Sequence, residues 1–357
     1  MPAPRRDLQH TQRLLEQWLA QRLGCPGEVE VSRLRGPTET GYSSDTLLFD
    51  AEVRRGKAKQ RLALVARLQP RGMTVFPEYD MQRQYRLLQW LHEQGTVPVP
   101  KALWYEGSPE ALGTPFFVME FVEGRVPSDN PPYHITGWLH ELSAEERREL
   151  WLNGLQAMAA VHALDASPLI GSLFPAPPPG ATWLESQLDE YRRFIHWGLV
   201  EDRYPLLKRA ERWLRAHAPR HETPRLCWGD SRIGNQLFRG TQCVALLDWE
   251  MARVGDPEQD LAWYLALDRC FSEGLGVEPL PGLGLRSESV ALWERTSGLC
   301  TRNLEYYEVL ALYKFSAIMA RVIVQLKHYE VFPLESDMDI HNLASLTLEH
   351  TLASLGW

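Results

Sequence analysis

The spacing of apolar residues changes near residue 127, and this change limits the folds that the chain can adopt. Upstream, three segments alternate apolar and polar residues with a period of two. Such alternation predicts β-strands that bury one face of a sheet. Downstream of the proline-rich stretch VPSDNPPY (126–133), apolar residues recur every three or four positions, which is typical of helices. The sequence therefore predicts a β-rich part followed by a helical part.

The first part is predicted to be an antiparallel sheet with two helices. Apolar residues at helical spacing predict an opening helix at 8–23 and a second helix at 78–95 that ends at Gly95. The dipeptide Arg55-Gly56 marks a turn between two strands. The predicted strands and extended segments are 29–36, 46–54, 61–69, 97–107 and 115–124.

The second part is predicted to be mostly helical around one short hairpin. Its first helix, 143–164, begins with the capping-box pair Ser143 and Glu146. The segments NQLF and CVALLDWE flank a turn at Arg239-Gly240 and predict the hairpin. Further helices are predicted at 182–197, 202–217, 257–267, 302–328 and 341–355.

Charge and cysteine content exclude several classes of protein. The formal net charge is −8, which argues against nucleic acid or an anionic membrane surface as the main partner. The five cysteines are scattered and form no CxxC pair or Cys/His cluster, so we expect neither a disulfide framework nor a zinc site. No apolar stretch follows the basic N-terminal residues, so we expect no signal peptide. A reducing, cytoplasmic setting fits these features best.

The longest apolar run, 309–326, is interrupted by Lys314 and Arg321. A membrane-spanning helix needs roughly 18 or more consecutive apolar residues. We therefore predict a buried helix in this region and no membrane partner.

Two short motifs carry oxygen-bearing side chains at a spacing that suits chemistry. CWGDSRIGN (227–235) contains Asp230 and Asn235, and LLDWE (246–250) contains Asp248. The predicted hairpin brings Asn235 close to Asp248 and leaves Asp230 in the loop before it. Carboxylate and amide oxygens are ligands that Mg²⁺ prefers, and a nearby carboxylate suits a proton acceptor. A lone Gly-Asp pair is typical of an ordinary turn, whereas the three residues together favour a site.

These motifs resemble a known signature. GDSRIGN followed by LDWE is similar to the phosphate-transfer signature of the aminoglycoside phosphotransferase and choline kinase group. The longer run GDSRIGNQLF…VALLDWEMARVGDPEQDLAWYLA is more similar to the branch that includes the kinase-like domain fused to some acyl-CoA dehydrogenases. The resemblance implies an α+β, bilobal protein-kinase-like fold, with an N-lobe at 1–122 and a helical C-lobe at 123–357.

The resemblance also implies roles for the two motifs. Asp230 would act as the base for an attacking hydroxyl, and Asn235 and Asp248 would hold Mg²⁺. The cofactors implied are ATP or GTP together with Mg²⁺. The motif carries Trp228 where the group usually has His.

The nucleotide-binding half departs from the usual pattern. The segment GYSSDT (41–46) stands where the family has its nucleotide-covering loop, so Ser43 and Ser44 are expected to contact phosphate, although a plain turn fits equally well. Arg67 occupies the third-strand position where kinases usually have Lys, and it binds phosphate as a rigid fork rather than a point charge. Gln84 stands where a Glu partner is usual and is expected to bond to Arg67 at most through a hydrogen bond.

The segment FFVMEFVEG (116–124) is the hinge candidate. By resemblance, backbone groups of Glu120 and Val122 would pair with the nucleotide base, and Met119 would lie behind it. A buried strand that runs into a turn gives the same pattern, and both interpretations hold together.

Other polar and aromatic residues have ordinary explanations. Asp256 and Asp260 would either belong to the site or simply cap the next helix, and Glu250 has no clearer assignment. His162 lies on an apolar helix face and is typical of a core histidine. Three further aromatic residues would either line an acceptor pocket or pack in the core, namely Trp183, Trp197 and Tyr307.

The function that these features favour is a Mg²⁺-dependent O-phosphotransferase. It would move the γ-phosphoryl group of ATP or GTP to a hydroxyl of a small molecule. Two alternatives stay open, an aminoglycoside antibiotic kinase and a nucleotide-binding module with little or no turnover, the latter because Arg67 and Gln84 replace the usual pair.

Overall fold

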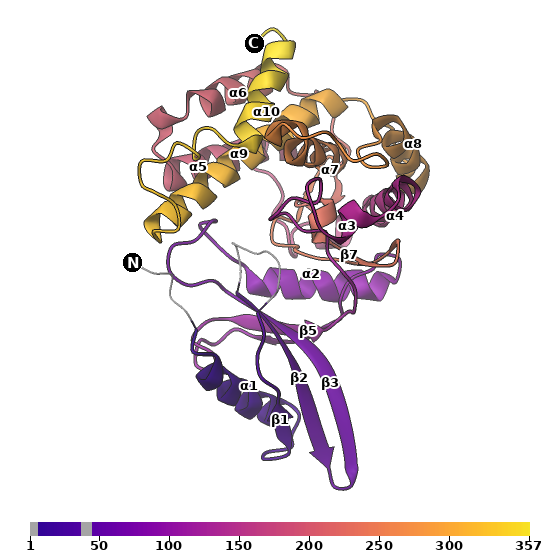
Figure 1. Cartoon of the computed structure of the whole chain (residues 1–357), viewed down its shortest axis with the longest axis vertical. Helices are drawn as coiled ribbons and strands as arrows, with labels where there is room; N and C mark the ends of the chain where they lie inside the picture. The colour runs from indigo at the N-terminus through magenta and orange to yellow at the C-terminus, as the bar shows by residue number, and fades with distance from the viewer. Residues whose placement is uncertain (1–5, 37–44) are drawn as a thin grey trace.

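The computed structural model describes residues 6–36 and 45–357. It shows an α+β fold in which an antiparallel sheet with two helices lies against a larger helical lobe (Figure 1). The predicted phosphate contacts Ser43 and Ser44 lie outside the described residues.

The five-stranded sheet follows the predicted segments. Its strands are β1 (Val29–Val31), β2 (Asp45–Arg55), β3 (Ala58–Leu68), β4 (Ala102–Glu106) and β5 (Phe116–Glu120). Their order in the sheet is β1-β2-β3-β5-β4, and each neighbouring pair is antiparallel.

The first strand is shorter than the predicted 29–36. Regular pairing ends after Val31 because the Ser32 hydroxyl accepts the Asp50 N–H at 2.9 Å in place of a backbone group. Beyond Val31 the Ser32 N–H still donates to the Asp50 carbonyl at 2.8 Å, and an isolated bridge joins Arg35 and Leu48.

Both faces of the sheet are covered. Alternation along β5 sends Phe116 toward the core under α1 (Leu8–Arg22) and Phe117 toward the core under α2 (Met81–Gln94). The α2 side is continuous with the core of the helical lobe. Figure 1 shows α2 between the sheet and that lobe, with α1 on the far side of the sheet.

The helical lobe contains the predicted helices and two that were not predicted. The short α3 (Trp138–Glu141) and α8 (Arg286–Ser297) lack a clear apolar stripe in sequence. Ser143 and Glu146 form the predicted capping box. The other helices are α4 (Ala144–His162), α5 (Trp183–Gly198), α6 (Pro205–Ala216), α7 (Glu258–Phe271), α9 (Leu304–His328) and α10 (Leu343–Ser354).

Helix α9 forms the centre of this lobe. It is long and apolar enough to cross a membrane by length and composition, yet 83% of that stretch is buried inside the protein. Lys314 and Arg321 are buried with it, at 3% and 7% exposure. The prediction of a buried helix here is confirmed.

Two small β-ribbons lie between the helices. The predicted hairpin forms from β7 (Gln236–Arg239) and β8 (Gln242–Leu246). A second pair, β6 (Arg225–Cys227) with β9 (Arg253–Gly255), encloses both motifs. These three-residue strands were not predicted, because so few residues show no period. Together the ribbons bring the two ends of the motif region close to each other.

A segment of the N-terminal part is bonded to the helical lobe. Residues 69–80, here called the strap, join β3 to α2. The Arg321 guanidinium donates to the Thr74 carbonyl at 2.8 and 3.0 Å, and the Tyr329 hydroxyl accepts the Met73 N–H at 2.7 Å. By sequence the strap falls in the predicted N-lobe, but these contacts are with the helical lobe. The predicted division at residues 122 and 123 stays a prediction.

Arg321→Met is expected to loosen the strap. The substitution removes the bonds to Thr74 and a third bond to the Gly198 carbonyl at 3.2 Å. We expect the free energy of unfolding to fall by about 2 kcal/mol and amide hydrogen exchange across residues 70–80 to accelerate. Arg193→Met, an exposed arginine on α5, is the control. Equal exchange of the strap in both variants would contradict this account.

Candidate active site

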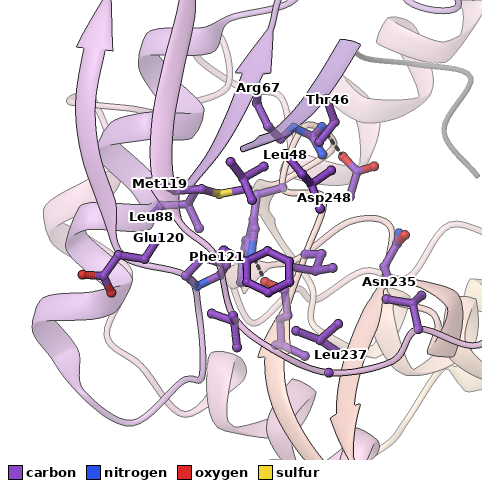
Figure 2. A pocket seen from close by; sticks show the side chains of 18 of the residues that line it. Thr46, Leu48, Arg67, Leu88, Met119, Glu120, Phe121, Asn235, Leu237 and Asp248 are labelled. Atoms are coloured by element: carbon purple, nitrogen blue, oxygen red, sulfur yellow. Dashed lines mark hydrogen bonds and ion pairs between the residues drawn. The ribbon is translucent and has the colours of Figure 1, made fainter. Parts of the chain in front are cut away.

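A cleft of about 450 Å³ lies between the sheet and the helical lobe. Its walls combine apolar side chains of the sheet, of the β7–β8 hairpin and of the linker that follows β5 from Phe121. Figure 2 shows Arg67 and Asp248 at one end of this cleft and the linker residue Phe121 nearer the other. Apolar residues that line it include Leu48, Val65, Leu88, Met119, Val122, Leu237 and Leu246.

The linker presents backbone groups to the cleft. The Glu120 N–H donates to the Lys101 carbonyl at 3.0 Å, and the Phe121 N–H donates to the Ala63 carbonyl at 2.9 Å. The Val122 N–H makes no hydrogen bond with any residue in 6–36 or 45–357. It is therefore available to a ligand, while the exposed Glu120 side chain points away from the cleft (Figure 2).

Arg67 reaches across the cleft from β3. Its guanidinium bonds to the Asp248 carboxylate at 2.9 Å and lies 3.8 Å from Glu250. Burial lowers the pKa of Arg67, but the two carboxylates raise it more, so the side chain stays charged. Gln84 lines the same cleft, yet within the described chain Arg67 bonds to Asp248 and not to Gln84. The expected hydrogen bond with Gln84 is absent because this carboxylate takes its place.

Asp248 has an uncommon backbone conformation. Its φ is +58°, in the left-handed region, and Glu330 is the other described non-glycine residue with positive φ. Aspartate tolerates this region better than most residues, and such conformations concentrate at functional sites. The bend lies directly after β8, where it turns the carboxylate toward Arg67.

Asn235 is fixed by hydrogen bonds from its amide nitrogen. This nitrogen donates to the Asp230 carbonyl at 3.0 Å and to the Asp230 carboxylate at 2.6 Å. The side-chain oxygen makes no hydrogen bond with a described residue. The Asn235 carbonyl accepts the Leu247 N–H at 2.9 Å, so the loop is tied to the residue before Asp248. As predicted, Asn235 and Asp248 line one cleft.

These two residues fit a magnesium ion. The free amide oxygen of Asn235 and the carboxylate of Asp248 are hard ligands, and Mg²⁺ commonly takes one or two protein oxygens with waters and phosphate oxygens. Across the described ranges no group of three or more His, Cys, Asp or Glu side chains is placed to hold a metal. A bound ion would therefore depend on ligands from a nucleotide.

Asp230 accepts hydrogen bonds on both carboxylate oxygens. Trp263 on α7 donates its indole N–H to one oxygen at 2.9 Å. Asn235 and Arg232 donate to the other, Arg232 at 3.2 Å. Donors on both oxygens fix the direction of this carboxylate. Sequence reasoning missed Trp263, because only the fold brings α7 against this loop.

Arg232 links Asp230 to the proline-rich stretch 126–133. Its guanidinium also pairs with Asp129. Burial lowers the pKa of Arg232, but Asp129 and Asp230 raise it above its ordinary value. Burial raises the pKa of Asp129, and Arg232 opposes that rise. Arg232 lies within the quoted motif, so its position was visible in sequence but its partner was not.

A buried carboxylate on α7 holds the loop before Asp230. Asp260 accepts the Trp228 N–H at 2.5 Å and the Gly229 N–H at 3.0 Å. His162 bonds to it at 3.0 Å, and Trp293 donates to the other ring nitrogen of His162 at 2.8 Å. That nitrogen therefore accepts, and the proton lies on the side of Asp260. His162 is the core residue that was predicted.

The remaining candidates divide between capping and packing. Asp256 caps α7 by accepting the Glu258 N–H at 3.1 Å, as one of its two interpretations predicts, whereas Asp260 is no simple cap. Tyr307 is buried in the core, and Trp197 is 46% exposed beside Arg321.

Gly229 is required by its surroundings. Its φ is +93°, and a Cβ there would lie 2.2 Å from the Met251 carbonyl oxygen. No other residue type fits without moving the backbone. The Gly-Asp step of the motif is thus set by the close approach of the segment after LLDWE.

Known proteins match this chain along most of its length. Residues 38–299 match the sequence profile of the family described as "Phosphotransferase enzyme family". Acyl-CoA dehydrogenase family member 11 of Rattus norvegicus is 25% identical over 303 residues, 78% of this chain and 37% of that protein. The probable acyl-CoA dehydrogenase IBR3 of Arabidopsis thaliana is 25% identical over 317 residues, 83% of this chain and 36% of that protein. The chain spans little more than a third of these relatives' length.

Solved structures share the fold at lower identity. A protein of Ralstonia eutropha JMP134 assigned to the aminoglycoside phosphotransferases is 21% identical with a TM-score of 0.66, covering 96% of this chain and 98% of that one. A thermostable mutant of aminoglycoside phosphotransferase APH(4)-Ia, in ternary complex with ADP and hygromycin B, is 17% identical with a TM-score of 0.57, covering 95% and 98%. The likeness confirms the predicted protein-kinase-like fold.

Asp260→Asn is expected to release the loop before Asp230. The single oxygen of the substituted amide cannot accept hydrogen bonds from Trp228, Gly229 and His162 at once. The amide NH₂ group, itself a donor, would then face at least one of these donors. We expect amide hydrogen exchange at residues 228–231 to accelerate and the free energy of unfolding to fall by about 3 kcal/mol.

Asp268→Asn is the matched control, because this buried α7 carboxylate bonds to Tyr133 and His134 instead of the loop. It should destabilise the protein without a selective effect on residues 228–231. Unchanged exchange of the loop in Asp260→Asn would refute the role of Asp260.

Proposed function

Because this chain belongs to the phosphotransferase enzyme family, we propose that it transfers the γ-phosphoryl group of ATP or GTP to a hydroxyl of a small molecule. The observation that carries the proposal is the hydrogen-bonded set of Asp230 and Asn235, joined through Leu247 to Asp248 at one end of a nucleotide-sized cleft. Proteins of this fold bind ADP in the same overall architecture, as in the APH(4)-Ia complex.

The nucleotide would lie along the cleft between the linker and Arg67. The base would pack between apolar residues such as Val65 and Leu237, with the Val122 N–H and the Glu120 carbonyl as hydrogen-bond partners. At the other end, the buried Nε of Arg67 has no partner within the described chain, so it is a donor that phosphate would satisfy. Phosphoryl transfer depends on such positioning and charge neutralisation.

Asn235 and Asp248 would hold Mg²⁺, which when bound neutralises charge on the phosphates. Arg67 already bonds to Asp248 at 2.9 Å, so it lies where it would share this task. The five free cysteines support a reducing, cytoplasmic setting.

Asp230 would orient and deprotonate the attacking hydroxyl. As the hydroxyl oxygen forms its bond to the γ-phosphorus, the bond from that phosphorus to the bridging oxygen breaks and ADP or GDP leaves with the electron pair. The hydroxyl proton passes to the Asp230 carboxylate and then to solvent. The donors Trp263 and Asn235 hold this carboxylate in one direction throughout.

We expect nucleotide binding to depend on Mg²⁺ and to require Asp248. With ATP or GTP at about 100 times its dissociation constant, the free energy of unfolding should rise by about 2.7 kcal/mol. Asp248→Ala should lose this gain, and Asp189→Ala, at an exposed carboxylate on α5, should keep it. Thermal unfolding with and without Mg²⁺ makes the measurement. An unchanged Mg²⁺-dependent gain in Asp248→Ala would remove the proposed metal site.

Asp230→Asn is expected to lower the rate of phosphoryl transfer by about 10²–10⁴-fold. The substitution keeps the size of the side chain but removes the proton acceptor, so nucleotide-induced stabilisation should remain. Steady-state rates with an acceptor that the wild type phosphorylates make the comparison. A rate equal to that of the wild type would show that another group handles the proton. Nucleotide binding without transfer in the wild type would instead support the binding-module alternative.

A further inference from the structure

A buried lysine lies near the candidate base and outside the nucleotide cleft. Lys314 on α9 is 3% exposed, and it makes no hydrogen bond or ion pair with any residue in the described ranges. Its ammonium instead lies over two rings, 4.8 Å from the centre of Trp263 and 5.5 Å from the centre of Tyr191. Rings offset only part of the loss of hydration that such a cation suffers.

A second cation lies close to the first. Arg253 on β9 pairs with Glu190 at 3.1 Å, but its Nε is buried without a partner in the described chain. Burial lowers the pKa of Lys314 to about 8, and repulsion from Arg253 lowers it as well. The carboxylate of Asp260 acts in the opposite direction, but its oxygens are already taken by the loop and by His162.

The position of this pair relative to the base is set by Trp263. The indole that Lys314 covers donates its N–H to Asp230 at 2.9 Å. The ammonium is therefore separated from the candidate base by roughly the width of one indole ring. Neither Lys314 nor Arg253 lines the nucleotide cleft. The helices that carry the site, α5, α7 and α9, pack together in the helical lobe (Figure 1).

The chemistry of the site points to an anion. Two neighbouring cations with unfilled donors are unfavourable in a buried place, and an oxyanion would satisfy both. The Tyr191 hydroxyl also makes no hydrogen bond with a described residue, so it can donate to the same group. A polycation such as an aminoglycoside would be repelled here.

We propose that the phosphoryl acceptor is a hydroxyl compound that also carries an oxyanion, a carboxylate or a phosphate monoester, bound by Lys314 and Arg253. The proposal rests on the proposed phosphotransferase function and names the class of its acceptor. With the oxyanion at Lys314, the hydroxyl lies a short spacer away at Asp230. Lys314 is thus a specificity-determining residue.

The test compares acceptors that differ only in charge. Short straight-chain hydroxy acids are paired with their primary amides, and glycerol 3-phosphate is paired with glycerol, so the two sources of oxyanion are separated. Each is assayed for thermal stabilisation in the presence of Mg²⁺ and a non-hydrolysable ATP analogue, and for phosphoryl transfer from ATP. Wild type, Lys314→Met, Lys314→Arg and Lys59→Met are compared; Lys59 is exposed on β3.

We expect the wild type to prefer the anionic member of at least one pair. Lys314→Met should raise the KM for that anion about tenfold or more, leave the KM for ATP unchanged and abolish the charge preference. Lys314→Arg should recover part of the preference, and Lys59→Met should keep all of it. The wild-type preference stands as a test even if Lys314→Met fails to fold.

Equal or better binding and transfer with the neutral partners, or no binding of any anionic member, would overturn this inference. Transfer to neutral or cationic hydroxyl compounds only would do so while leaving the phosphotransferase function intact. That function itself would fail differently, through the absence of Mg²⁺-dependent nucleotide binding.

Discussion

One buried carboxylate organises the candidate site. Asp260 accepts the backbone N–H groups of Trp228 and Gly229 and is itself held by His162. This fixes the loop from which Asp230 and Asn235 project, and their mutual hydrogen bonds then follow. A loop is the mobile kind of element on which reactive groups usually lie. Here the core of the helical lobe fixes it through a single charged group.

Charged groups of both signs lie around this loop. On the nucleotide side, carboxylates of the helical lobe face Arg67 of the sheet, which suits phosphates and a divalent ion. Near Asp230 but outside this cleft lie two cations, Lys314 of α9, which is buried over Trp263, and Arg253 of β9, whose Nε is buried without a partner in the described chain. The strap is also hydrogen-bonded to the helical lobe, through Arg321. The candidate base Asp230 therefore lies near charged groups of both signs.

The sequence predicts the local elements and the motif geometry but little of the long-range support. Periodicity located the strands of the five-stranded sheet and most helices, and the hairpin spacing placed Asn235 and Asp248 at one cleft. It could not show that Asp260 supports the loop or that Trp263 contacts Asp230, because those contacts join residues 31 to 33 positions apart. The pairing of Arg67 with Asp248 spans 181 positions and depends on how the lobes meet.

Phosphorus-31 NMR of ATP, Mg²⁺ and the hydroxy-compound panel with the wild-type protein would reveal the proposed transfer of a phosphoryl group to a hydroxyl. We expect the γ-phosphate signal to disappear while ADP and a new phosphate monoester appear in equal amounts, and Asp230→Asn to slow all three changes together. Formation of inorganic phosphate without a monoester, or no change beyond that of ATP alone, would contradict it.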